Sequence, residues 1–294
     1  MKQFISTALK GFGMGAANVV PGVSGGTIAL ITGIYSRLIA AISAFASVSI
    51  WKLFFRGDFK QWWKEVDGNF LVALFVGLVV SILTLAKVVT WALVEYPVIT
   101  WAFFFGLIIV SAFYMLMDIK DKRLKDSLWI IIGIALGLAF CFLTPTHTPE
   151  TSWFYFVSGA VAICTMILPG ISGSFVLQIF GNYDIIMKSL DVSALNWSVL
   201  VPFALGAIVG IVAFSKFLKW LLSRYERQTM LLLVGFVLGT MLKIWPWADM
   251  EAVNAAGHGL QIVEAIVAIA VGVGLVVLIQ SLSKKQESNT DCQK

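Results

Sequence analysis

Long apolar stretches fill this 294-residue chain, and short polar segments separate them. Many of the stretches can cross a bilayer, since about 20 helical residues span its hydrocarbon core. The segments predicted to lie in the membrane are 4–20, 24–48, 70–93, 98–117, 127–143, 152–168, 172–188, 198–223, 228–246 and 261–282. The pattern predicts an all-α polytopic membrane protein.

The charges of the connecting segments predict the orientation of the chain. Lys and Arg gather at 51–67, 118–126 and 224–227, whereas 144–151 and 248–259 contain neither residue. Because basic loops stay on the cytoplasmic side, both termini are expected in the cytoplasm. Segment 51–67 also carries paired aromatic residues, which predicts an interfacial cytoplasmic position.

Composition supports a membrane protein and excludes several other classes. Hydrophobic residues make up 59% of the chain and charged residues 13%, with a mean hydropathy of +0.91. No soluble domain of this size has that balance. The net charge of +5 comes from the short basic loops, so no nucleic-acid partner is expected. The three cysteines, His147 and His258 fit no metal-binding spacing, and neither a metal nor a cofactor is expected.

One motif occurs twice. Residues 18–27 are Asn-Val-Val-Pro-Gly-Val-Ser-Gly-Gly-Thr, and residues 166–175 are Met-Ile-Leu-Pro-Gly-Ile-Ser-Gly-Ser-Phe. Identical residues lie 148 positions apart: Pro21 and Pro169, Gly22 and Gly170, Ser24 and Ser172, Gly25 and Gly173, Gly33 and Gly181, Tyr35 and Tyr183. Pro and Gly interrupt a helix, and Ser can cap the next one. Each copy therefore predicts a helix, a break and a second helix.

The segments after each motif also repeat. Five residues of the first half recur 129 positions later: Gly77, Lys87, Trp91, Tyr96 and Gly106 match Gly206, Lys216, Trp220, Tyr225 and Gly235. Together with the loop charges, this predicts an inverted-topology repeat, in which each half is a re-entrant helical hairpin plus two spans. Repeat one is 1–117, the linking span 127–143, repeat two 152–247 and the final span 261–282. The alternative that 24–48 crosses the membrane completely stays open.

The two breaks are expected to meet near the bilayer midplane and to bind an anion. Helices that begin after Ser24 and Ser172 would expose unpaired N–H groups and the positive end of a helix dipole, which suit a phosphate or a carboxylate. The candidate ligands are Asn18, Pro21, Gly22, Ser24, Gly25, Gly26 and Thr27 in the first copy, and Pro169, Gly170, Ser172, Gly173 and Ser174 in the second. The alternative is that these small residues only allow close helix packing.

Three cations are candidates to assist this site. Arg37 follows the first motif, and Lys87 and Lys216 are repeat-matched lysines inside apolar segments. Cations at such depth are costly and usually functional. The alternative is that they extend to the membrane interface.

Several of these residues together resemble the bacterial polyprenyl-phosphate transporter family. The resemblance rests on residues 13–27 with 33–35, on Leu168-Pro-Gly-Ile-Ser-Gly173 and on Leu242-Lys-Ile-Trp-Pro-Trp247, and it covers about 5–282. It implies a flippase of the bacterial inner membrane with the lipid undecaprenyl phosphate as its partner. Such a protein would return this carrier from the outer to the inner leaflet after cell-wall precursors are used.

Two other functions compete with lipid transport. A membrane undecaprenyl-pyrophosphate phosphatase would carry an arginine where Gly25 and Gly173 stand, and a glutamate pair in an adjacent span, whereas Glu95 and Glu264 are single. A small-anion transporter would use the same broken helices. Coupling to a proton or ion gradient and a homodimeric state stay open. Replacing Arg37 or Ser172 is expected to abolish head-group binding without unfolding.

Overall fold

The computed structural model describes residues 2–20, 23–117, 119, 124–143, 149–190, 195–248, 250–257 and 259–291. Its elements are all helical, as predicted. The first half contains α1 (Lys2–Val19), α2 (Gly25–Ile31), α3 (Tyr35–Ala44), α4 (Val48–Phe55), α5 (Phe59–Glu65), α6 (Gly68–Glu95), α7 (Pro97–Met117) and α8 (Leu124–Cys141). The second half contains α9 (Ser152–Ile167), α10 (Gly173–Ile179), α11 (Tyr183–Ser189), α12 (Trp197–Arg224), α13 (Glu226–Thr240), the 3₁₀-helix η1 (Met241–Ile244), α14 (Met250–Ala255) and α15 (Ile262–Asp291).

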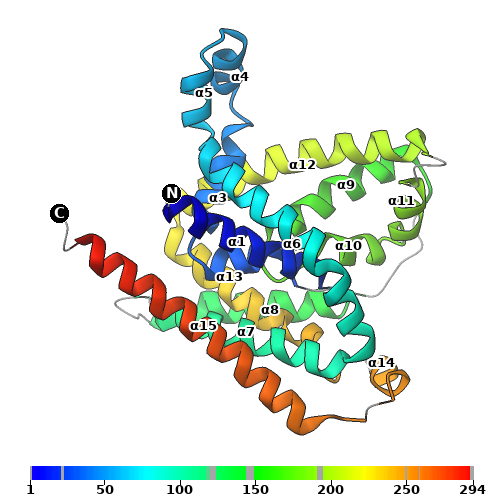
Figure 1. The fold of residues 1–294 in the computed structure, drawn as a ribbon. Coiled ribbons are helices and arrows are strands. Elements are labelled where there is room, and N and C mark those ends of the chain that lie inside the picture. The colour runs from blue at the N-terminus through cyan, green and yellow to red at the C-terminus, as the bar shows by residue number, and fades with distance from the viewer. Residues whose placement is uncertain are drawn as a thin grey trace.

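Among the described residues, four of the predicted spans form continuous helices long and apolar enough to cross a membrane. They are α6, α7, α12 and the continuous segment of α13 with η1. This confirms the polytopic membrane class. Figure 1 shows that α1 begins and α15 ends at the same end of the helical body, while α11 and α14 lie at the other end.

The segment 24–48 does not form one continuous crossing helix. It divides into α2 and α3 at Gly33, whose φ is +70°, and 172–188 divides into α10 and α11 at Gly181, whose φ is +67°. Glycine adopts this left-handed conformation without steric cost, which explains why it stands at both matched positions. The segment is therefore broken, and the alternative that it crosses the membrane completely stays a prediction.

Matched glycines make matched contacts between the first helix of each hairpin and the span that follows it. A Cβ added to Gly77 of α6 would lie 1.9 Å from the carbonyl oxygen of Ala8, and one added to Gly206 of α12 would lie 1.8 Å from that of Phe156. A second set shows the same approach at 2.1 Å: Gly11 to the Leu74 oxygen and Gly159 to the Phe203 oxygen. Such small residues let membrane helices pack backbone to backbone. The alignment found in the sequence thus corresponds to equivalent packing in the two halves.

The linking helix and the final helix also occupy equivalent places. α8 packs along α13, and α15 packs along α7. Matched glycines again form the contacts, because a Cβ on Gly235 would lie 2.3 Å from the Ile130 oxygen and one on Gly106 would lie 2.4 Å from the Ile269 oxygen. The sequence analysis placed the linking span 127–143 and the final span 261–282 outside the two repeats and did not predict their partners. The helix that follows each second span packs on the second span of the other half.

Candidate functional site

The first break is closed by its own side chains. The Oδ1 atom of Asn18 accepts a hydrogen bond from the Gly25 N–H (2.7 Å), and Ser24 caps α2 by accepting from the Gly26 N–H at 3.0 Å. The Thr27 N–H donates to the Ser24 carbonyl (2.9 Å). Residues 23–30 are all buried. The expectation of unpaired N–H groups here is therefore wrong, because Asn18 and Ser24 already satisfy them. Pro21 and Gly22 lie outside the described residues.

The two breaks are in direct contact, as the motif analysis expected. The Ser24 hydroxyl donates to the Met166 carbonyl (3.1 Å), and the Tyr35 hydroxyl donates to the Ile167 carbonyl (3.4 Å). In the other direction, the Gly170 N–H donates to Thr27 Oγ1 (2.8 Å). Carbonyl groups in the last turn of a helix lack intrahelical partners, so these hydroxyls satisfy the end of α9. We call this set of hydrogen bonds the seal.

The second break has the opposite character. Ser172, Gly173 and Ser174 are half-buried, and the Ser172 hydroxyl bonds to that of Ser174 (2.6 Å) instead of capping α10. Within the described part of the chain, the N–H groups of Gly173 and Ser174 have no acceptor. Pro169 is buried, and Gly170 adopts φ +87°. Among the described residues, the N–H groups of Gly25, Gly26 and Thr27 are paired at the first break, whereas those of Gly173 and Ser174 at the second are free.

A cation that the site prediction missed lies beside the second break. Lys243 of η1 places its Nζ 4.4 Å from the centre of the Phe175 ring. Thr240, in the turn before it, approaches Gly170, where an added Cβ would lie 2.6 Å from the threonine Oγ1. The Lys243 side chain is exposed and has no acidic partner among the described residues. The sequence could have pointed to Lys243, because this lysine belongs to the motif 242–247.

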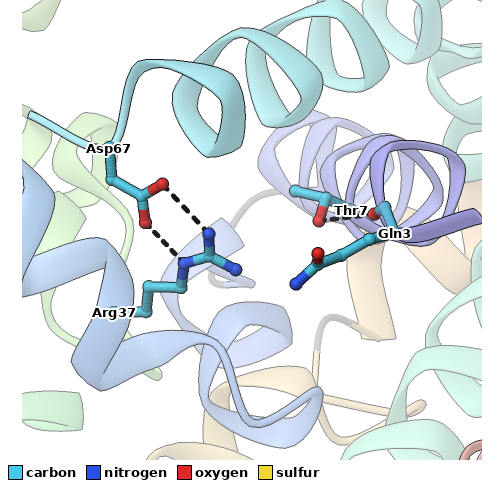
Figure 2. Close-up of polar contacts among 4 residues, drawn as sticks. All are labelled: Gln3, Thr7, Arg37 and Asp67. Atoms are coloured by element: carbon cyan, nitrogen blue, oxygen red, sulfur yellow. Dashed lines mark hydrogen bonds and ion pairs between the residues drawn. The ribbon is translucent and has the colours of Figure 1, made fainter. Parts of the chain in front are cut away.

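The three predicted cations lie elsewhere. Arg37 forms a two-pronged ion pair with Asp67 (2.6 and 3.0 Å) and stacks over Phe70 at 4.3 Å. Figure 2 shows this pair, with the Gln3 side chain of α1 pointing toward the guanidinium. Lys87 and Lys216 are exposed on α6 and α12, and no hydrogen bond or ion pair joins either to a motif residue. The structure thus brings none of the three into contact with the breaks, and their binding role stays a prediction.

The two hairpins also differ in how they pack against the opposite half. α3 packs on α12, where Tyr35 (1% exposed) and Ile39 share a buried cluster with Leu218 and Leu222. Among the described residues, the repeat-matched helices α11 and α6 form no comparable interface, and Tyr183 is only half-buried. The contact of α3 with α12 therefore closes one end of the space between the halves, whereas among the described residues no such contact closes the end at α11 and α6.

A small pocket marks the closed end. It lies between α2, α7 and α13 and has room for about one water molecule. Its wall is apolar apart from one hydroxyl, with Thr27, Leu30, Ile108 and Val237 among the residues that form it. A phosphate cannot pass here unless the hairpins separate.

No metal site is present in the described residues, where no three His, Cys, Asp or Glu side chains gather. His147 and His258 lie outside the described residues.

Comparison with known proteins places the chain in a family. A family model described as undecaprenyl phosphate translocase-like matches residues 14–262, which include both breaks and Lys243. The chain belongs to this family. A polyprenyl-phosphate transporter from Vibrio cholerae is 43% identical over 264 residues, which cover 89% of this chain and 85% of the relative. A second, from Staphylococcus aureus, is 34% identical over 254 residues, 81% of this chain and 85% of the relative. No solved structure matches the chain. Membership of this family agrees with a transporter and not with the phosphatase alternative.

Proposed function

We propose that the chain carries undecaprenyl phosphate from the outer to the inner leaflet of the bacterial cytoplasmic membrane, with both termini in the cytoplasm. The family and two relatives named polyprenyl-phosphate transporter support the substrate. One observation supports a start from the outer leaflet: the described residues of the first break are buried and the N–H groups of Gly25, Gly26 and Thr27 are paired, whereas the second break is half-buried and the N–H groups of Gly173 and Ser174 are free. In the predicted topology, the second hairpin enters from the outer face, so the free donors meet a head group that arrives there.

The lipid phosphate binds at the second break in this proposal. Its oxygens accept hydrogen bonds from the N–H groups of Gly173 and Ser174 and from the Ser172 hydroxyl, and the Lys243 ammonium balances their charge. Hydrogen bonds to a charged group contribute more than neutral ones, about 1.5–3 kcal/mol each. Because α10 has only seven residues, we assign the attraction to these donors and the ammonium instead of a helix dipole.

The surroundings of the second break favour a lipid over a small anion. Met166, at the end of α9, is 46% exposed, and its Cβ lies 3.6 Å from the position of a Cβ on Gly173. An exposed apolar side chain at this place keeps the route to the break apolar, which suits a polyprenyl tail that stays in the bilayer. A site for a free inorganic anion would gain from polar walls instead.

The inverted repeat supplies the second conformation. Equivalent glycine contacts in both halves support the internal repeat, and the loop charges predict that the halves have opposite orientations. In such a fold, each hairpin can adopt the conformation now seen in the other. The first hairpin then leaves the seal and opens inward while the second closes, which exposes the phosphate to the cytoplasmic leaflet.

Reconstituted vesicles test this proposal. They contain polyprenyl phosphate labelled with ³²P, and a soluble lipid-phosphate phosphatase added outside releases label only from the outer leaflet. We expect the protein to make the label of the inner leaflet releasable too, and Lys243→Gln to slow this about 10- to 100-fold, as loss of one charged hydrogen bond predicts. Lys219→Gln, at an exposed lysine of α12, is the matched control and should transport like the parent.

Two outcomes would contradict the proposal. Protection of the inner-leaflet label in vesicles with folded protein would exclude lipid transport. Uptake of labelled sulfate by the same vesicles, at a rate that Lys243→Gln reduces, would instead favour a small-anion transporter.

A further inference from the structure

The α4–α5 hairpin (Val48–Glu65) stands away from the helical body, as Figure 1 shows. α4 begins just after α3 and is bent from it by 60°. Ile50 is the one buried residue of α4, and α5 has none. Two helices of eight and seven residues are too short to be stable in water without packing. The hairpin therefore needs a surface beyond the chain itself.

The side chains that the hairpin leaves exposed are mainly aromatic. Phe55 is 82% exposed, Phe59 58%, Trp51 44% and Trp63 41%. Phe54 holds the two helices together through edge contacts with Phe59 and a tilted contact with Trp62, each at 5.5 Å. Aromatic rings that stay exposed at the edge of such a cluster are typical of the zone between lipid head groups and tails.

Four cations accompany these rings. Lys52 lies in the last turn of α4 and Arg56 directly follows this helix, while Lys60 and Lys64 lie one turn apart on α5. Residues 48–65 are all described, and none of the four forms an ion pair or a side-chain hydrogen bond. The hairpin thus presents aromatic rings for an apolar layer and unpaired positive charges for an anionic one.

We propose that the α4–α5 hairpin lies in the membrane interface and binds the anionic phospholipid surface of the cytoplasmic leaflet. The leaflet follows from the predicted topology, which places 51–67 inside. Only two residues, Val66 and Asp67, join α5 to α6, and three join α3 to α4, so the hairpin cannot move far from the membrane that holds α3 and α6. Aromatic rings at the acyl boundary and lysine or arginine heads at the phosphates are the arrangement of an in-plane anchor. This anchor would hold the cytoplasmic end of the first hairpin at a fixed depth.

A fluorescent probe on the hairpin tests this anchor in the full-length protein. A bimane on Phe55→Cys, with the three native cysteines replaced, is compared in nanodiscs of phosphatidylcholine alone and of phosphatidylcholine with phosphatidylglycerol. We expect brominated lipids to quench the probe and aqueous iodide to quench it little, with at least a two-fold stronger lipid effect in the anionic nanodiscs. Combined replacement of Lys52, Arg56, Lys60 and Lys64 by Gln, or 0.5 M salt, should remove that difference.

A probe on Leu83→Cys is the matched control, since this α6 side chain is 77% exposed in a spanning helix and should be lipid-quenched in both nanodiscs. Strong iodide quenching at position 55 in both nanodiscs would overturn the proposal and favour a soluble protein partner. Lipid quenching that depends neither on phosphatidylglycerol nor on the four cations would overturn the recognition of anionic lipid. Neither result depends on whether the protein transports lipid.

Discussion

The hydrogen bond between Thr27 and Gly170 offers a direct test of the seal. Thr27 is completely buried, and its Oγ1 accepts from the Gly170 N–H at 2.8 Å. Thr27→Val preserves the shape of the side chain but removes the acceptor. A buried donor without a partner costs about 1–3 kcal/mol. If the Gly170 N–H reaches water when the hairpins separate, the sealed conformation should lose about 5- to 150-fold in population relative to the open one.

A buried cysteine can report this change. Leu218 of α12 is 2% exposed and shares the buried cluster with α3, so a maleimide reaches Leu218→Cys only when the hairpin moves away. In inverted membrane vesicles, the labelling rate therefore measures the population that is open to the cytoplasm. We expect Thr27→Val to raise this rate about 5- to 150-fold.

Two controls isolate the hydroxyl. Thr27→Ser retains the acceptor and should label close to the parent rate. Thr84→Val removes a hydroxyl that bonds only within α6, to the Val80 and Ser81 carbonyls, and should have no effect. An unchanged rate in Thr27→Val, with a normal unfolding temperature, would refute the seal. An equal rise in both Thr27 variants would assign the effect to side-chain shape.

Two further predictions concern stability and the ion pair. Gly77→Ala and Gly206→Ala should each destabilise the protein by about 1–3 kcal/mol in thermal unfolding, because the new Cβ would lie 1.9 and 1.8 Å, respectively, from a backbone oxygen. Gly274→Ala is the control and should not destabilise the protein, since a Cβ at this position meets nothing within 4 Å. Arg37→Gln should cost at most about 1 kcal/mol, since its pair with Asp67 is partly exposed, and should leave binding of polyprenyl phosphate near the parent value. Loss of that binding at an unchanged unfolding temperature would instead support the role that the sequence predicted for Arg37.

The features that the sequence predicted are those that depend on local backbone geometry. Gly33 and Gly181 recur because each needs a left-handed conformation, and Gly77 and Gly206 recur because each meets a backbone oxygen. A requirement of this kind allows one residue type, so it leaves a visible match in both halves. The broken helices and the contact between the two breaks were predicted from such residues, whereas the close pairing of α1 with α6 became visible only in the structure.

The features that the sequence did not reveal depend on tertiary neighbours. Arg37 follows the first motif closely, yet the carboxylate that binds it comes from the start of α6. Lys243 is distant in sequence from the second motif, and the approach of Val237 and Thr240 of α13 to Gly170 brings it near Phe175. Gly106 and Gly235 recur where α15 packs on α7 and where α8 packs on α13, but this match does not reveal the partner helix, because long apolar helices can pack on many partners.

The difference between the two breaks, however, is present in the sequence. Position 18 is Asn and its match is Met166, while position 26 is Gly and its match is Ser174. A Cβ added to Gly26 would lie 2.6 Å from the Ile167 oxygen, so only a glycine at position 26 lets the first break approach the second this closely. A side chain at Ser174 prevents the same close approach in reverse. The first copy is thus suited to close, and the second to remain open.

Met166→Asn tests whether this difference controls head-group binding. An Asn at 166 should place its carbonyl oxygen on the Gly173 N–H, as Asn18 does on that of Gly25 at 2.7 Å, and so compete with the phosphate for the donor. Loss of one hydrogen bond to a charged group predicts affinity for polyprenyl phosphate about 10- to 100-fold weaker, measured by ligand-induced shifts in unfolding temperature. Met166→Leu, which offers no acceptor, should bind like the parent. If both variants bind normally, the free N–H of the second break is not a phosphate ligand, and the head group must be held elsewhere.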